Sequence, residues 1–188
     1  MILKWLFDRF VAFFGLLFLW PVILITAILV KIKMPGGPAF FVQKRVGKNG
    51  KLFNCHKFRS MTVKHSGSTV SVAGDSRITP FGAKLRHYKI DELPGLWDVL
   101  IGNMSFVGPR PKVGTIDYNN LTEDKKKSYS IKPGVTGYAQ AYFRNSISND
   151  EKYHWDAYYA DNITFWMDIK VIYMTVYSVI VSKNINTH

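Results

Sequence analysis

The longest feature in the pattern of apolar and polar positions is a nearly continuous apolar run close to the start of the chain. Residues 10–30 are apolar except for Gly15, Pro21 and Thr26. This stretch of 21 residues is long enough, as a helix, to cross the hydrocarbon core of a bilayer, which is about 30 Å thick. A secretory signal peptide fits poorly, because its apolar segment is shorter and ends in small residues, whereas lysines follow here. The pattern predicts a membrane-associated N-terminal helix.

Two features of this run argue against a simple crossing of the bilayer. Pro21 lies in its middle, where a proline removes a backbone hydrogen bond and kinks a helix. Both flanks are basic, with Lys4 and Arg9 before the run and Lys31 and Lys33 after it. The positive-inside rule therefore gives no direction for a single crossing. We predict a re-entrant helix that returns to the cytoplasmic face, with a spanning helix and a buried helix of a soluble protein as alternatives.

The remainder of the chain alternates between short strand patterns and helical patterns. Two strands, at residues 39–42 and 51–54, flank the turn sequence at 47–50. Residues 102–112 contain Gly-Pro-Arg-Pro and predict a rigid turn, and residues 65–74 predict a mobile loop. Apolar periodicity and helix-end signals predict helices at residues 80–90, 93–100, 122–128, from 148 onward, and 165–181.

These elements predict an α+β fold that is mostly α-helical. We expect residues 1–33 to form the re-entrant membrane anchor and residues 34–188 to form one cytosolic unit. That unit carries a short β-hairpin and helices that lie at the membrane interface, for which the apolar segment 165–181 is the main candidate.

Composition and charge narrow the class of protein. The chain has 25 Lys and Arg against 13 Asp and Glu, a formal net charge of +12, and no carboxylate lies between Asp8 and Asp75. A single cysteine, Cys55, excludes a disulfide scaffold and argues against a cysteine-based zinc site. So basic a segment favours an anionic partner, such as lipid head groups or phosphates, over a merely solvated surface. A nucleic-acid-binding module on a membrane anchor is an alternative.

The adjacent acids Asp91 and Glu92 are the strongest candidates for chemistry. Pro94 is tolerated in the first turn of a helix, which places Asp91 near an N-cap, where partial positive charge and free N–H groups favour anions. Neighbouring helical side chains point roughly 100° apart, so the two carboxylates suit different roles, such as nucleophile and metal ligand. Helix capping alone is the structural alternative.

Cationic residues in rigid surroundings accompany this acid pair. Lys57 and Arg59 lie in Lys-Phe-Arg-Ser-Met, and Arg110 lies in Gly-Pro-Arg-Pro. Arginine can hold a phosphate through two hydrogen bonds, and lysine acts as a point charge. A carboxylate nucleophile that meets a phosphate needs such neighbours to overcome charge repulsion. The combination favours an enzyme that acts on phosphorylated substrates.

Five motifs together resemble one family. The chain resembles the bacterial sugar transferases, monotopic phosphoglycosyl transferases that start cell-surface glycan assembly on polyprenyl phosphate, in the minimal form without an added transmembrane bundle. The motifs follow in order along nearly the whole chain: Phe-Val-Gln-Lys-Arg-Val-Gly at 41–47, Lys-Phe-Arg-Ser-Met at 57–61, Asp-Glu-Leu-Pro at 91–94, Met-Ser-Phe-Val-Gly-Pro-Arg-Pro at 104–111, and Pro-Gly-Val-Thr-Gly at 133–137.

The resemblance implies a two-step reaction. Asp91 would attack the β-phosphate of a UDP-sugar and release UMP, and polyprenyl phosphate would then take the phosphosugar from the aspartate. Glu92 would be the partner acid and act with Mg²⁺, a hard cation that suits carboxylate and phosphate oxygens, and Asp168 is a second candidate metal ligand. The resemblance further implies phosphate- or nucleotide-binding roles for Lys57, Arg59, Arg86, Arg110 and Arg144, and structural roles for Pro21, Pro109 and Pro111.

The resemblance also implies a setting. The protein would lie on the inner membrane of a bacterium, with its catalytic domain facing the cytoplasm and its surface in contact with membrane lipids. It would not bind nucleic acid, and both a monomer and a homodimer remain open. A catalytically inactive relative is a further alternative, although the intact acid pair argues against it.

Two positions depart from the family pattern. Trp20 precedes Pro21 where the family often has serine, so one hydroxyl that could satisfy the broken helix is missing. Phe143 replaces the usual glycine before Arg144 and Asn145, which would reshape the pocket for the sugar or the nucleotide.

Overall fold

A computed structural model describes residues 2–63, 75–144 and 146–181. The predicted loop at 65–74 and Asn145 lie outside the described residues. The described chain is mostly helical and carries two small sheets, which confirms the mostly helical α+β fold.

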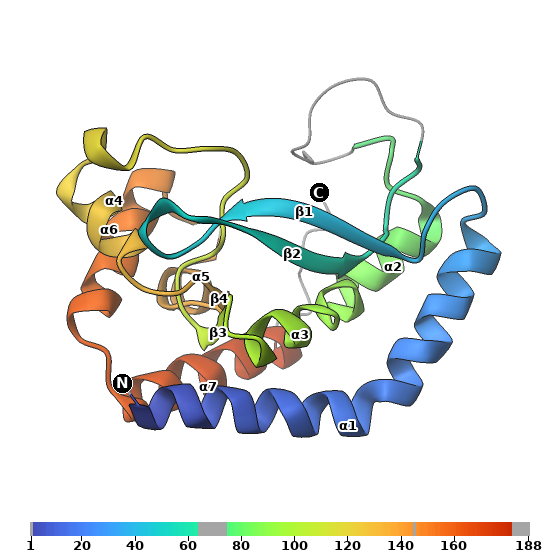
Figure 1. The fold of residues 1–188 in the computed structure, drawn as a ribbon, viewed down its shortest axis with the longest axis horizontal. Helices are drawn as coiled ribbons and strands as arrows, with labels where there is room; N and C mark the ends of the chain where they lie inside the picture. The colour runs from blue at the N-terminus through green and yellow to red at the C-terminus, as the bar shows by residue number, and fades with distance from the viewer. Residues whose placement is uncertain (1, 64–74, 145, 182–188) are drawn as a thin grey trace.

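The N-terminal segment forms one long helix, α1 (Ile2–Lys33), with Pro21 inside it. Helical structure continues on both sides of the proline, and Figure 1 shows that the helix is bent, so that its two halves run in different directions. A bend is expected because proline cannot donate the backbone hydrogen bond of its turn and clashes with the preceding turn. The predicted kink is therefore present, without a break in the helix.

Most apolar side chains of α1 lie on the protein surface. Within the described residues, α1 alone is long and apolar enough to cross a bilayer. Its buried residues come in two pairs at i, i+4 spacing, Asp8 with Ala12 and Thr26 with Val30. Ala12 packs with Val99 and Met104 of the remainder of the chain. Each half of α1 therefore rests on the body through a narrow stripe and leaves a wide apolar face exposed.

The predicted hairpin is present, with longer strands than the pattern indicated. Strand β1 (Phe40–Val46) pairs antiparallel with β2 (Leu52–Phe58), and Gln43 lies opposite Cys55. The short helix η1 (Lys48–Gly50) forms the turn, where Asn49 adopts a left-handed conformation that asparagine tolerates well. The hairpin places Lys57 near the end of β2, beside the acid pair.

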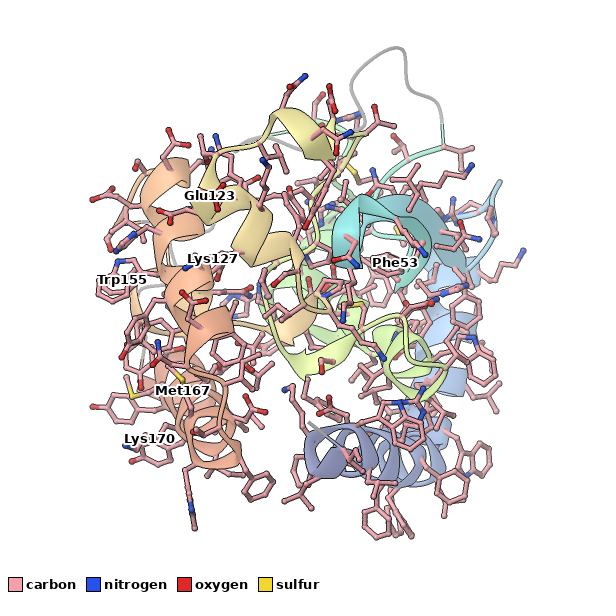
Figure 2. The ribbon with its side chains drawn as sticks, turned by 60° about the vertical axis from the view of Figure 1, so that its left-hand side comes forward. Phe53, Glu123, Lys127, Trp155, Met167 and Lys170 are labelled. Carbon is pink, nitrogen blue, oxygen red and sulfur yellow. The ribbon has the colours of Figure 1, made fainter. Side chains whose placement is uncertain are left out.

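The predicted helices are present with modest differences at their ends, and the short helices at residues 118–120 and 138–142 were not predicted. Two of the predicted helices, α4 and α6, lie side by side (Figure 2), and Lys127 of α4 contacts Asp161 of α6 at 2.6 Å. The helical elements are α2 (Pro80–His87), η2 (Ile90–Glu92), α3 (Gly95–Leu100), η3 (Tyr118–Asn120), α4 (Glu123–Tyr129), α5 (Tyr138–Tyr142), α6 (Asn149–Asp161) and α7 (Phe165–Val181).

A second sheet was not predicted. Strand β3 (Ser105–Val107) pairs in parallel with β4 (Gly134–Thr136). The prediction of a turn without regular structure at 102–112 was therefore wrong over three residues. The pairing depends on glycine, because a Cβ atom on Gly134 would lie 2.2 Å from the backbone nitrogen of Gly108. Three-residue strands held by backbone proximity show no alternation of apolar and polar positions that could predict them.

Candidate functional site

The acid pair lies on η2, between α2 and α3. Asp91 is 7% exposed, and α3 begins four residues later, at Gly95, with Pro94 preceding it. Lys89 precedes η2 in the left-handed conformation, with φ 57°, which turns the chain sharply out of α2. Asp91 is therefore not the N-cap of the following helix, which corrects the prediction of N-terminal capping.

Asp91 has the environment of a reactive carboxylate. Its Oδ1 atom is buried and has no hydrogen-bond partner among the described residues. Burial raises the pKa of Asp91 above its ordinary value, the neighbouring charge of Glu92 raises it further, and Lys57, Lys89 and Arg86 oppose the shift. A buried carboxylate with an oxygen that accepts no hydrogen bond is a poorly stabilised anion, and such an anion is a better nucleophile.

Glu92 has the opposite environment. Its Oε1 atom accepts a hydrogen bond from Nζ of Lys57 at 2.7 Å and lies 3.7 Å from Nη2 of Arg110. Burial raises the pKa of Glu92, but Lys57 and Arg110 outweigh burial and lower it to about 2. Two adjacent carboxylates with pKa values displaced in opposite directions suit two different roles. Glu92 is a fixed anion that holds two cations beside Asp91.

The loop that carries Arg110 is held from two sides. Nη1 of Arg45, on β1, donates to the carbonyl oxygen of Pro111 at 3.1 Å. The backbone N–H of Gly134 donates to the carbonyl oxygen of Pro109 at 2.9 Å. Pro109 and Pro111 also fix their own backbone torsions. The guanidinium of Arg110 is thereby presented to Glu92 by a rigid loop.

The other predicted phosphate ligands fall into two groups. Arg86 lies near Asp91, and its Nε donates to the Ser60 hydroxyl at 2.9 Å. Arg59 is buried and donates to the carbonyl oxygen of Met34, next to the C-terminal end of α1. The structure thus places Arg86 at the acid pair with Lys57, whereas Arg59 ties the hairpin to the end of α1.

Asp168 belongs to a different cluster. It is buried on α7, where Nζ of Lys4 contacts its Oδ2 at 2.6 Å and the Tyr159 hydroxyl donates to its Oδ1. Across the described ranges, no group of three or more His, Cys, Asp and Glu side chains is placed to hold a metal. The structure does not bring Asp168 together with Glu92, so these two candidate metal ligands do not form one site.

A pocket of about 800 Å³ opens beside the acid pair. Glu92 and Arg110 line it, together with Lys89 and Arg144. Arg144 adopts a left-handed conformation, and its Nη2 donates to the carbonyl oxygen of Ser178 at 2.6 Å. The pocket is large enough for a nucleotide-sized ligand, and its cationic wall suits a diphosphate.

The polar lining of this pocket includes Lys112, Gln140 and Asp156, which the sequence analysis did not single out. The pattern of residues 138–142 and 149–161 shows nothing that separates these polar side chains from surface ones. Their grouping depends on the packing of α5 against α6, which only the structure shows.

Comparisons with known proteins agree with this geometry. The family model described as "Bacterial sugar transferase" matches residues 1–182. The chain is 42% identical to an uncharacterized sugar transferase, EpsL, of Bacillus subtilis, over 98% of this chain and 91% of that protein. It is 39% identical to the exopolysaccharide production protein PSS of Rhizobium leguminosarum, over 95% of both chains.

A third relative is a larger protein. The chain is 38% identical to a UDP-glucose:undecaprenyl-phosphate glucose-1-phosphate transferase of Xanthomonas campestris, over 96% of this chain but 39% of that protein. The chain therefore spans less than half of the length of this relative.

Proposed function

Because this chain belongs to the bacterial sugar transferase family, we propose that it moves a sugar 1-phosphate from a UDP-sugar to undecaprenyl phosphate and so initiates a surface glycan. Relatives are named for this reaction with glucose, galactose and N-acetylgalactosamine donors. The observation that carries the proposal is the buried Asp91 with a free Oδ1, beside a Glu92 whose charge is fixed by Lys57 and Arg110.

The first step forms a covalent intermediate. An Oδ atom of Asp91 attacks the β-phosphorus of the UDP-sugar, a P–O bond forms, and the bond to the oxygen that bridges the two phosphates breaks. UMP leaves with that oxygen, and the sugar 1-phosphate stays on Asp91. Arg86, Lys57 and Arg110 stabilise the charge that develops on the phosphoryl oxygens.

The second step regenerates the carboxylate. A phosphate oxygen of undecaprenyl phosphate attacks the same phosphorus, and the bond to Asp91 breaks. The product is undecaprenyl diphosphate-sugar. The cationic residues fixed by Glu92 serve both steps, because each transfers a phosphoryl group at the same phosphorus.

Asp91 and Glu92 fit a Mg²⁺ ion in this site. The Oδ1 atom of Asp91 is buried and has no hydrogen-bond partner among the described residues, so the carboxylate that acts as the nucleophile could also contact Mg²⁺, which is typically held by one or two carboxylates together with substrate phosphates. When bound, the ion would neutralise charge on the diphosphate and orient it.

A donor screen tests the function. Purified protein in nanodiscs is mixed with Mg²⁺, undecaprenyl phosphate and a panel of UDP-sugars, and UMP is measured. We expect release with one or a few donors, and omission of Mg²⁺ should lower the rate. If no donor leads to UMP release, and thermal unfolding shows that the protein is folded, the proposal is contradicted and an inactive relative is favoured.

We propose that α1 lies in the cytoplasmic leaflet of a bacterial inner membrane as a re-entrant helix. The bend at Pro21 and the basic residues at both ends of α1 support this topology. On α7, Trp166 is 73% exposed, and Tyr173 and Tyr177 are also exposed, and aromatic side chains of this kind are enriched at membrane interfaces.

Labelling from each side of the membrane tests the topology. Single cysteines replace Ile2 and Lys33 in a Cys55→Ser background, and a membrane-impermeant maleimide is applied to inverted and to right-side-out vesicles. We expect both positions to react only in inverted vesicles, whose cytoplasmic face is outside. Reaction of the two positions in opposite preparations would instead show a spanning helix.

A further inference from the structure

The pocket beside the acid pair has a second polar region, where α5 meets α6. Asp156 of α6 lines it and is 7% exposed. Gln140 of α5 lines it as well, and its Oε1 atom is buried without a hydrogen-bond partner among the described residues. α5 packs against both α6 and α7 (Figure 1). Two buried acceptors on two packed helices therefore border the same cavity as Glu92.

The two acceptors differ in their surroundings, because Oε1 of Gln140 has no hydrogen-bond partner among the described residues, whereas the Asp156 carboxylate has one. Asp156 accepts the backbone N–H of Ala139, and Lys112 and Lys152 contribute nearby positive charge. Burial nevertheless raises the pKa of Asp156 to about 7, because the cations do not offset desolvation. A buried acceptor costs free energy unless a donor meets it. A ligand that brings polar hydrogens into the pocket would meet that need.

The chemistry selects one part of the donor substrate. A diphosphate carries acceptor oxygens and no donor, so it could not donate a hydrogen bond to Oε1 of Gln140 or to the Asp156 carboxylate, whereas the wall with Arg110 and Lys89 attracts it. The imide edge of uracil carries a single N–H between two carbonyl acceptors. It could therefore donate a hydrogen bond to only one of the two protein acceptors and would place a carbonyl oxygen against the other. A hexose presents several neighbouring hydroxyl donors, and a carboxylate together with an amide oxygen matches them.

We propose that Asp156 and Gln140 form the subsite for the hydroxyl groups of the transferred sugar and determine which UDP-sugar is used. This role rests on the proposed function. Glu92, Lys57 and Arg110 serve the phosphates, which all candidate donors share. The hydroxyl pattern is the feature in which the donors differ. Acceptors fixed on packed helices discriminate between such patterns better than acceptors on a loop.

Two variants test the subsite. In Asp156→Asn, the amide oxygen can still accept from Ala139, but an N–H₂ donor replaces the second acceptor oxygen. Gln140→Leu removes the Oε1 acceptor at similar size. The matched control is Asp161→Asn on the same helix, where the acid is exposed and pairs with Lys127.

The measurement is equilibrium binding by calorimetry, in nanodiscs, of UDP-glucose, UDP-galactose, UDP-N-acetylglucosamine and UDP-N-acetylgalactosamine, with UDP as the probe that lacks a sugar. We expect each subsite variant to weaken the donor that wild type binds best by about ten- to a hundredfold, as for hydrogen bonds to charged or buried groups. Binding of UDP should change by less than about twofold, and Asp161→Asn should change neither ligand.

Equal weakening of UDP and the UDP-sugar would overturn the sugar subsite and place uridine or phosphate there. Unchanged binding of the UDP-sugar in both variants would overturn it as well, as would a wild type that binds none of the four. If Asp156→Asn lowers the unfolding temperature, Gln140→Leu decides. A wild type that binds UDP-sugars without releasing UMP would contradict the proposed transfer and leave the subsite standing.

Discussion

Asp91→Asn is expected to abolish UMP release, with a loss of at least about a thousandfold, because an amide cannot replace a carboxylate as the nucleophile of a covalent mechanism. The substitution keeps the shape of the side chain and removes a buried, poorly stabilised charge. The free energy of unfolding should therefore not fall. The measurement is the initial rate of UMP release with the best donor, paired with thermal unfolding of the same preparation.

Intact-protein mass spectrometry tests the assignment of Asp91 as the nucleophile by detecting the covalent intermediate. Without undecaprenyl phosphate, wild type should gain the mass of one sugar phosphate, and peptide mapping should place it on Asp91. Glu92→Gln, the neighbouring carboxylate-to-amide change, should be slow but still gain the adduct, because Asp91 remains. Full activity of a folded Asp91→Asn, or an adduct on another residue, would refute Asp91 as the nucleophile.

Lys4→Met, which lies outside the site, is expected to lower the free energy of unfolding by about 3–5 kcal/mol, the usual cost of removing one partner of a buried ion pair. Nζ of Lys4 contacts Oδ2 of Asp168 at 2.6 Å and donates to the Val107 carbonyl oxygen at 3.2 Å. Methionine keeps the length of the side chain but leaves Asp168 without this cation, with the Tyr159 hydroxyl still donating to its Oδ1. The unfolding temperature in detergent should fall by roughly 10 °C for a chain of this size.

A control and a double variant separate this ion pair from general effects of losing a lysine. Lys170 lies exposed on α7, pointing away from the body of the molecule (Figure 2), so Lys170→Met should leave the unfolding temperature unchanged. Adding Asp168→Asn to Lys4→Met removes the orphaned charge and should recover part of the loss. A Lys4→Met protein as stable as Lys170→Met would show that the pair does not stabilise the fold.

Local patterns predicted the elements whose residues are neighbours in sequence. The hairpin follows from two strand patterns around the turn at 47–50, and the bend of α1 follows from Pro21 alone. The grouping of Lys57 and Arg110 with Glu92 was also predictable in kind, because adjacent carboxylates facing phosphate require cations.

What depends on long-range packing could not be predicted. The β3–β4 pairing joins two three-residue segments, and backbone contact at Gly108 and Gly134 fixes it. Arg59 carries the same charge as Lys57, two residues earlier, yet its side chain contacts the end of α1. Alternate residues share a face only within a regular strand, and β2 ends at Phe58, between these two residues. The subsite with Asp156 exists only through the packing of α5 on α6.

The contact between Lys4 and Asp168 has a consequence for the order of events during synthesis. Lys4 leaves the ribosome 164 residues before Asp168, so α1 is free to enter the bilayer long before its ionic partner exists. With α1 inserted early, as the proposed membrane topology requires, the contact between α1 and α7 forms late, when Asp168 of α7 reaches Lys4 in the first turn of α1. A protein expressed without the first turn of α1 would therefore lack Lys4, the cation that contacts the buried Asp168 of α7.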